Sequence, residues 1–392
     1  MACSGGQMLL IASDNTKQRR AVMDVVRELS LTLTIFASSE TLAELMGGQS
    51  RRLVLLTEKD VSERAVAILR EAERNAQFGV IVAGDPHNPR DNSRVGAFEQ
   101  LAKLENLEWV RPNFGCNDLG SAARACRSRM LRVSREDLDE ALRERQFFVQ
   151  YQPKVERGTT TRWLTREAEA LVRWRHPEHG QLGPLEFLPE MEEFGLIGRL
   201  TDFVLHESAA QLVRWKNKGL DLDACINLAS SQLTDPELPA RCAELVGKYG
   251  LQCSKFTFEV AEQDFGKPEA PHLQTLGALR KKGFRLCLDD FRVAAASLGA
   301  LDQMPFDEIK IHATALARAQ GNDVRMKVLA AIIGLAHSLG MTVCAEGVED
   351  HETFEFLKTI NCDKMQGFLI SEAVLPKLLR KVYGPGASDQ VA

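Results

Sequence analysis

Short apolar runs alternate with longer amphipathic segments along most of this chain, and this alternation restricts the possible folds more than any other feature. Over residues 1–130 it occurs five times, with runs such as "QMLLIAS" and "FGVIVAG" between segments at helical spacing. Such a pattern predicts an α/β domain, a doubly wound parallel sheet covered by helices. A ligand of such a sheet binds near the carboxyl ends of its strands.

This first region resembles the flavodoxin-like receiver domain of response regulators in the order and length of its elements. Thr57 lies where that family has its phosphoacceptor aspartate, and Arg111 lies where it has a lysine. Ser13 and Asp14 stand where it has a pair of acids. We therefore predict a pseudo-receiver without a phosphoacceptor, which docks or dimerises. Phosphorylation at a displaced acid such as Asp60 is the alternative.

A connecting helix is predicted over residues 131–146, where Ser134 is a good N-cap and Asp137 follows three residues later. A second alternation of apolar and amphipathic segments covers residues 147–380, before a flexible tail at residues 381–392. It repeats about eight times, which favours a TIM-like (β/α)₈ barrel. The chemistry of such barrels lies at the C-terminal ends of the strands.

Composition argues against several classes of protein. The formal net charge of −5 gives no overall attraction to nucleic acid. The nine cysteines include no Cys-x-x-Cys pair, so we expect neither a disulfide framework nor a zinc site. No apolar stretch is long enough to cross a membrane, and the N-terminus lacks a signal-peptide pattern. The expected location is the cytoplasm, without membrane contact.

Acidic and amide side chains follow the apolar runs of the predicted barrel. Because strand ends far apart in the sequence meet at one barrel mouth, they should form one site. Clustered carboxylates repel one another unless cations neutralise them, and oxygen ligands suit Mg²⁺ or Mn²⁺. Two such ions would activate a water for phosphodiester hydrolysis. The candidate residues are Glu169, Asn227, Glu259, Glu262, Asp289, Asp290, Lys310, Glu346, Glu349 and Gln366.

Seven ordered motifs resemble the EAL-domain family of cyclic di-GMP phosphodiesterases: "EALVRWRHP", "INLASSQL", "FEVAE", "LDDF", "EIKI", "CAEGVE" and "MQGF". The resemblance covers about residues 140 to 377. It implies hydrolysis of cyclic di-GMP to linear pGpG with two Mg²⁺ or Mn²⁺ ions. The implied ligands are Glu169, Asn227, Glu259 and Asp289 for one ion, and Asp289, Asp290 and Glu346 for the second.

The same resemblance implies roles for further residues. Lys310 would orient the reacting water or stabilise the developing charge, with a nearby carboxylate taking the proton, and Gln366 would help to hold the arrangement. Arg173 would pair with a ligand phosphate, and Gln152 would contact the nucleotide. Glu349 would contact a guanine. An ion pair at the barrel rim and a helix-start acid are the structural alternatives for Arg173 and Glu349. The expected catalytic residues are Lys310, Glu346, Glu169 and Gln366.

The paired acids are followed by "RVAAASL", where the family has a glycine-rich loop of the type "GTGYSSL". Arg292 and Ala294 replace glycines that adopt positive φ freely, and Glu262 is the residue that braces this loop in the family. Loss of such support weakens metal affinity about ten- to a hundredfold. We therefore predict a slow or conditionally active hydrolase.

The main alternative is a non-catalytic sensor that binds cyclic di-GMP and acts through a partner, and a scaffolding protein is a third possibility. For either activity we expect a homodimer or higher homo-oligomer. A regulatory protein of a two-component pathway would bind through the pseudo-receiver.

Overall fold

The chain has 392 residues, and its structure is a computed structural model. The structure describes residues 8–11, 32–35, 42, 52–57, 61–73, 78–84, 95–104, 106–111, 116–130, 133–157, 163–262, 270–291, 305–311 and 323–383. They divide into two compact units. The first comprises Met1–Phe147 and Arg173–Phe194, and the second comprises Phe148–Val172 and Gly195–Ala392. The domain boundaries that we drew from the sequence remain a prediction.

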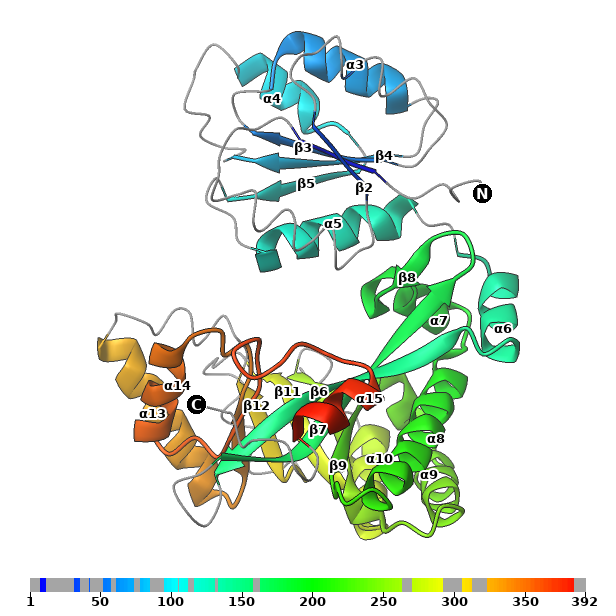
Figure 1. Cartoon of the computed structure of the whole chain (residues 1–392), viewed down its shortest axis with the longest axis vertical. Helices are drawn as coiled ribbons and strands as arrows, with labels where there is room; N and C mark the ends of the chain where they lie inside the picture. The colour runs from blue at the N-terminus through cyan, green and yellow to red at the C-terminus, as the bar shows by residue number, and fades with distance from the viewer. Residues whose placement is uncertain are drawn as a thin grey trace. The chain divides into compact units, whose positions relative to one another are not determined.

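The first unit contains a five-stranded sheet in the order β2-β1-β3-β4-β5, and every pairing in it is parallel. Helices α3 and α4 cover one face and α5 covers the other (Figure 1). Strands covered on both faces are apolar along their length, as β4 is, with every residue buried. The elements are β1 (Met8–Ile11), β2 (Thr32–Ile35), β3 (Arg52–Thr57), α3 (Glu63–Glu73), β4 (Phe78–Ala83), α4 (Val95–Leu101), β5 (Leu107–Val110) and α5 (Cys116–Met130).

Thr57 is the last residue of β3, at the carboxyl end where the sequence comparison with receiver domains places it. Arg111 follows β5 and is exposed. The remaining residues of the pseudo-receiver prediction, Ser13, Asp14 and Asp60, lie outside the described residues.

Helix α6 (Arg135–Arg143) begins where the sequence predicts a connecting helix. The Ser134 hydroxyl accepts a hydrogen bond from the Asp137 N–H at 3.2 Å. The Asp137 carboxylate in turn accepts one from the Ser134 N–H at 2.9 Å. Two N–H groups that the first turn of a helix leaves unpaired are thereby satisfied, which fixes the start of the helix.

Eight of the described strands form a closed sheet in the order β6-β14-β13-β12-β11-β10-β9-β7, and pairing of β6 with β7 closes it (Figure 1). A ninth strand, β8 (Gly180–Leu182), pairs antiparallel with β7. The barrel strands are β6 (Phe147–Arg157), β7 (Trp163–His176), β9 (Asp223–Asn227), β10 (Phe256–Ala261), β11 (Arg285–Phe291), β12 (Glu308–Ile311), β13 (Thr342–Ala345) and β14 (Lys364–Met365).

The barrel predicted from the sequence is present, but one strand departs from the all-parallel TIM pattern. From β7 round to β14 the neighbours are parallel, whereas β14 and β6 are antiparallel. The cause is the short connection between Arg157 and Trp163, because a parallel crossover needs a dozen or so residues. Strand β6 therefore enters the barrel in the opposite direction from the others.

Within the first unit, η2 (Pro184–Glu186) and α7 (Leu188–Glu193) follow β8. The described helices of the second unit are α8 (Ile197–Lys216), η3 (Ser230–Thr234), α9 (Leu238–Gly247), η4 (Cys253–Lys255), α10 (Ala270–Lys281), α13 (Asp323–Ser338), α14 (His351–Thr359) and α15 (Pro376–Tyr383). Of these, α8, α9, α10, α13 and α14 lie outside the barrel (Figure 1). Within the described ranges, no helix combines the length and the apolar character that crossing a membrane requires.

Side chains along the barrel strands alternate between the helices and the barrel interior. On β10, Phe258 and Val260 are fully buried on the helix side, and Glu259 between them is 1% exposed and faces inward. Strand β12 repeats this pattern, with Lys310 between two buried isoleucines. The interior of this barrel is therefore polar, whereas that of most such barrels is filled by branched apolar residues.

Candidate active site

Four carboxylates surround the ammonium group of Lys310 at the mouth of the barrel. Lys310 Nζ lies 3.3 Å from Glu169 Oε2, 3.1 Å from Glu259 Oε2, 3.1 Å from Asp289 Oδ1 and 3.4 Å from Glu346 Oε2. The lysine is 1% exposed. The acids come from β7, β10, β11 and the segment after β13, so the structure brings together residues that the sequence predicts to converge, although Glu169 lies in the middle of β7 and not at its end.

A second group of acids lies beside this cluster. Carboxylate oxygens of Asp289, Asp290 and Glu346 lie within 4.8 Å of one another, and all three residues are half-buried. Their donor atoms are all oxygen, which fits a hard cation such as Mg²⁺ or Mn²⁺. The structure therefore carries a candidate acidic metal site at the predicted position.

An irregularity in β11 explains how the carboxylates of the consecutive residues Asp289 and Asp290 lie in the same group of acids. Consecutive residues of a regular strand point to opposite faces. The pairing of β11 with β12 shifts register between Leu288 and Phe291, and Asp290 adopts φ of 57°. The Asp290 N–H donates to Asp289 Oδ1 at 2.9 Å. Bulges of this kind redirect a side chain and are frequent next to active sites.

Amide side chains hold Glu169 in place. Asn227 Nδ2 donates to Glu169 Oε1 at 2.9 Å, and Gln366 Nε2 donates to Glu169 Oε2 at 2.8 Å. Gln366 Nε2 also donates to Gln152 Oε1 at 2.9 Å, and Gln152 Nε2 donates to the Ser371 carbonyl at 3.0 Å. Gln152, expected from the sequence to contact the nucleotide, thus supports Gln366 through its amide oxygen, while its amide nitrogen binds Ser371.

The acids at the mouth have strongly perturbed pKa values. Burial raises the pKa of Glu259 to about 7, although nearby lysines act in the opposite direction. Burial likewise raises the pKa of Asp289 and of Glu346. For Glu169, burial also acts to raise the pKa, but the ammonium groups around it, Lys310 first, lower it to about 2. When ionised, the four carboxylates around Lys310 outnumber the two lysines that contact them, Lys310 and Lys154, so a bound divalent cation would be favoured.

Comparison with known proteins assigns the family. The model of the EAL domain family matches residues 135–373, which is more than half of the chain. The chain belongs to the EAL domain family. The match confirms the family resemblance that the seven sequence motifs indicate.

The curated relatives of this chain are longer than the region that matches it. The chain is 35% identical over 241 residues to an uncharacterized signaling protein of Caulobacter vibrioides, a match that covers 60% of this chain and 28% of that protein. It is 32% identical over 236 residues to the cyclic di-GMP phosphodiesterase PA2567 of Pseudomonas aeruginosa, with 60% and 40% covered. The match thus spans less than half of either relative.

A solved structure supports the barrel assignment. The PaMucR phosphodiesterase in complex with c-di-GMP is 31% identical and has a TM-score of 0.57, covering 62% of this chain and 98% of that one. The EAL enzyme Bd1971, with cAMP and cyclic-di-GMP bound, has a TM-score of 0.58 at 25% identity, with 63% of this chain and 67% of that chain covered.

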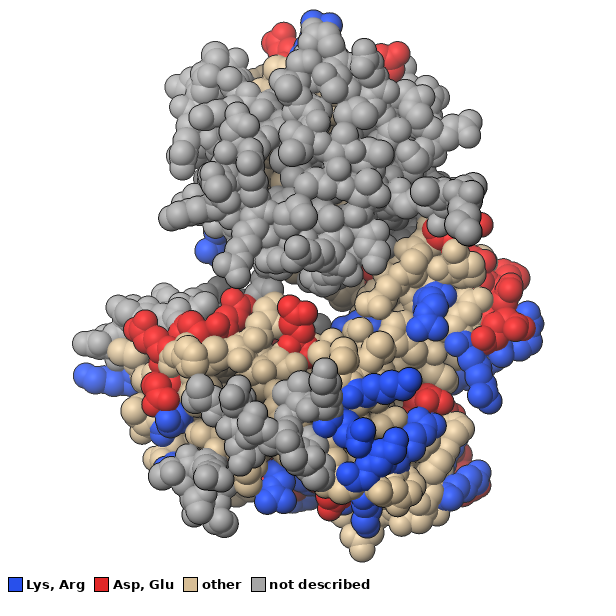
Figure 2. Space-filling model, viewed as in Figure 1, with Lys and Arg blue, Asp and Glu red and all other residues tan. Residues whose placement is uncertain are grey.

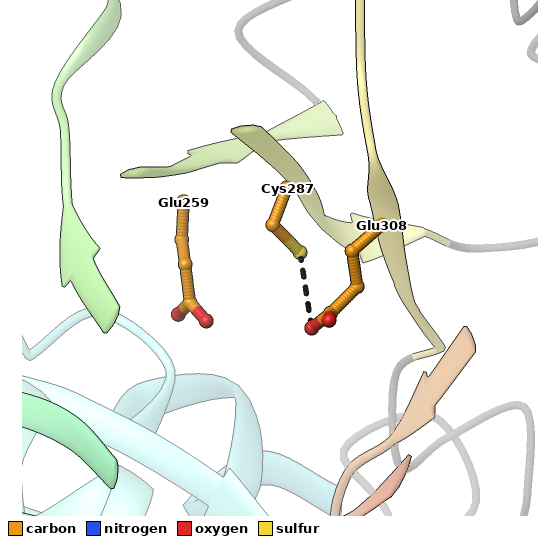
Figure 3. Close-up of side chains that lie close together, drawn as sticks. All are labelled: Glu259, Cys287 and Glu308. Atoms are coloured by element: carbon orange, nitrogen blue, oxygen red, sulfur yellow. Dashed lines mark hydrogen bonds between the residues drawn. The ribbon is translucent and has the colours of Figure 1, made fainter. Parts of the chain in front are cut away.

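Below the mouth, the EAL barrel of this chain contains a second layer of ionisable side chains that the sequence analysis missed. Ligand atoms of Glu259, Cys287 and Glu308 lie within 4.8 Å of one another, and all three residues are buried (Figure 3). Lys154 from β6 lies among them, with Nζ 2.5 Å from Glu259 Oε1, 3.7 Å from Glu308 Oε1 and 3.0 Å from Cys225 Sγ. A lysine therefore supplies the positive charge in this cluster.

A signal for this layer is present in the sequence. Side chains two positions apart on a strand share a face, so the residue two before each mouth residue lies one layer deeper. On β6, which runs in the opposite direction, Lys154 comes two residues after Gln152. The pairs on the other strands are Glu167 and Glu169, Cys225 and Asn227, Thr257 and Glu259, Cys287 and Asp289, Glu308 and Lys310, Cys344 and Glu346, and Lys364 and Gln366.

The remaining predicted residues lie at the edges of the described structure. Glu349 is exposed in the segment between β13 and α14, and acidic side chains gather on the side of α13 and α14 (Figure 2). Glu262 is half-buried just after β10. The alanine loop that it would brace, residues 292–300, lies outside the described residues. Arg173 is half-buried on β7 and belongs to the first compact unit.

Proposed function

We propose that the chain hydrolyses cyclic di-GMP to linear pGpG at the mouth of its EAL barrel. The observation that carries this proposal is the convergence of four carboxylates on Lys310, next to the paired acids of the bulged strand β11. Relatives of the EAL family include cyclic di-GMP phosphodiesterases, which supports the choice of substrate.

Most of the site residues are proposed to bind two metal ions. Two bound Mg²⁺ or Mn²⁺ ions would supply Lewis acidity and a water activated at neutral pH. The ligands we assign to one ion are Glu169, Asn227, Glu259 and Asp289, and those of the other are Asp289, Asp290 and Glu346.

The groups that do not bind metal orient the reaction. Lys310, held between carboxylates, places a positive charge where negative charge develops on the phosphoryl group, and a neighbouring carboxylate takes the proton of the water. Gln366, supported by Gln152, keeps Glu169 in its orientation. Arg173 pairs with a ligand phosphate and Glu349 contacts a guanine.

The first unit is proposed to be a pseudo-receiver with a docking role. The strand order β2-β1-β3-β4-β5 is that of flavodoxin-like folds, to which receiver domains belong. Thr57 at the end of β3 cannot form the acyl phosphate of a receiver domain. We propose a cytoplasmic homodimer whose hydrolysis is slow or conditional, because residues 292–296 lack the glycines that the family has there.

Product chromatography tests the proposal. The full chain is incubated with cyclic di-GMP and Mg²⁺ or Mn²⁺, and we expect pGpG to form. Glu169→Gln should abolish its formation, whereas the control Glu244→Gln, on the exposed face of α9, should not. Nucleotide binding without any product would refute hydrolysis and establish the sensor instead. Equal activity in Glu169→Gln and the parent would move the chemistry away from this site.

A further inference from the structure

Both carboxylate oxygens of Glu259 are held by ammonium groups, one from each layer of the barrel. Lys310 Nζ lies 3.1 Å from Oε2 on the side of the mouth. Lys154 Nζ lies 2.5 Å from Oε1 on the deeper side. Lys154 and Glu259 are each 1% exposed, so water does not screen their interaction. The orientation of the Glu259 carboxylate is therefore set by two lysines, only one of which belongs to the mouth.

The position of Lys154 is itself fixed by a ring of partners. Its Nζ donates to Cys225 Sγ at 3.0 Å and lies 3.7 Å from both Glu167 Oε2 and Glu308 Oε1. Strand β6 is antiparallel to its neighbour β14, so this lysine comes from the one strand that reaches the barrel in the opposite direction. Movement of Lys154 away from Glu259 would break a buried ion pair with Oε1 and a buried hydrogen bond to Cys225.

The two deeper glutamates are neutralised by another lysine. Lys364 Nζ lies 2.8 Å from Glu167 Oε2 and 2.6 Å from Glu308 Oε2, and Arg285 also contacts Glu167 at 3.2 Å. These distances are shorter than the 3.7 Å that separates Lys154 from the same two acids. The charge of Lys154 is thus directed mainly at Glu259.

We propose that Lys154 is a positioning residue for the metal site: by holding Oε1 of Glu259 it presents Oε2 to the ion. The inference rests on the proposed function, in which Glu259 is a metal ligand. Two effects of removing Lys154 oppose each other. Loss of a positive charge favours a cation, whereas loss of the anchor lets Glu259 reorient. Loss of a group that orients a ligand costs about ten- to a hundredfold in metal affinity, so we expect weaker binding.

Calorimetric titration of Mn²⁺ into the metal-stripped full chain tests this, because it measures affinity without turnover. Lys154→Met should bind Mn²⁺ about ten- to a hundredfold more weakly than the parent. The matched control is Lys364→Met, which also removes a buried ammonium from the same layer, but no contact that the structure gives with Glu259. Its Kd should stay within about threefold of the parent value, since it touches no proposed ligand.

A double-mutant cycle separates positioning from general damage to the barrel. In Glu259→Gln the ligand that Lys154 orients has lost its charge, so adding Lys154→Met should change Kd by less than about threefold. The double variant removes both partners of the buried ion pair and leaves no unpaired charge from it. Comparison of the double variant with Glu259→Gln therefore remains a test even where Lys154→Met alone does not fold.

The outcomes are distinguishable. An unchanged or tighter Kd in folded Lys154→Met overturns the inference and leaves the proposed function in place. Equal weakening in Lys364→Met, or a further tenfold loss on adding Lys154→Met to Glu259→Gln, also overturns it. A parent protein that binds no Mn²⁺ refutes both the metal site and the role of Lys154.

Discussion

The chain builds one parallel sheet and one largely parallel barrel, and the two differ in the side chains that they carry at or near the ends of their described strands. The five described strands of the first unit end in Ile11, Ile35, Thr57, Ala83 and Val110, none of which ionises. The barrel strands carry polar residues within their last three positions, namely Asn227, Glu259, Asp289 and Lys310, and β7 carries Glu169 at its middle. Both architectures gather their strand ends along one edge or mouth. The side chains placed there, rather than the fold, decide which sheet is suited to chemistry.

The largest expected effect comes from removing the cation at the centre of the mouth. Lys310→Met should lower the hydrolysis rate more than about 100-fold, because several proposed ligands lose their common partner. It also leaves buried carboxylates uncompensated, which costs about 3–5 kcal/mol and lowers Tm by about 10 °C.

Enzyme assays and thermal unfolding with Mg²⁺ present and absent measure both effects. The control is Lys358→Met, which loses an exposed pair with Glu355 and a cation–π contact with Phe354, both weak and away from the mouth, and should behave nearly like the parent. A rate within tenfold of the parent in Lys310→Met would show that the mouth does not work as we describe.

A smaller effect is expected from rebuilding the loop after the paired acids. Replacing residues 292–296 (Arg-Val-Ala-Ala-Ala) by Gly-Thr-Gly-Tyr-Ser restores residues that adopt positive φ. The Mg²⁺ concentration for half-maximal rate should fall by about tenfold, and turnover should rise. Mg²⁺ titrations at fixed nucleotide, with the oligomeric state recorded, measure this. Unchanged metal dependence in a folded, nucleotide-binding variant would mean that the alanine loop is a tolerated alternative.

The pH dependence of stability should reveal the buried carboxylates. Burial raises the pKa of Glu259 from its ordinary 4.5 to about 7, so between these values the folded protein holds a proton that the unfolded chain has lost. This contribution stabilises the metal-free fold at low pH and is lost as pH rises through about 7. At pH 8 the ionised cluster repels itself, and a cation relieves that repulsion.

Mg²⁺ should therefore raise Tm by a few degrees more at pH 8 than at pH 6. Thermal unfolding in Mg²⁺ and in EDTA at both values measures the difference. Glu259→Gln, which does not titrate, is the matched control and should show a reduced dependence. The same Mg²⁺-induced increase in Tm at both pH values would contradict the pKa shifts.

The smallest expected effect is in the phosphorylation of the first unit by a small phosphoryl donor. Incubation with acetyl phosphate should give no stable phosphorylation in residues 1–130, since Thr57 occupies the acceptor position and Arg111 that of the lysine. Mass spectrometry after labelling measures this. An acyl phosphate on any aspartate of this region, with Asp60 the first to inspect, would overturn the pseudo-receiver assignment. Both sheets would then carry reactive residues.

Sequence reasoning recovers the order of strands and helices because each apolar run is long enough to be buried and each amphipathic segment has helical spacing. It also places Glu169, Glu259 and Asp289 at one mouth, since parallel strands share the direction in which they end. It does not give the antiparallel direction of β6, which depends on how the barrel closes. Nor does it give the turn of Asp290 toward the mouth, which depends on a bulge set by pairing with β12.

The deeper layer shows a different limit of sequence reasoning. The rule that places functional residues at strand ends does not indicate Glu308 or Lys364. Each lies two positions before a mouth residue, however, and therefore shares its face. Their pairing at 2.6 Å joins strands 56 residues apart in the sequence. A period-two pattern indicates that such residues face inward, but only the closed barrel determines which of them meet.

Single-turnover hydrolysis tests the central claim most directly, because it separates slow chemistry from binding alone. The full chain, in excess over cyclic di-GMP, is mixed with Mg²⁺, and pGpG is measured over time beside a sample in EDTA. We predict that the bound nucleotide is converted to pGpG with Mg²⁺ and not with EDTA. Nucleotide that stays bound and intact in Mg²⁺ over many hours would contradict a hydrolytic site.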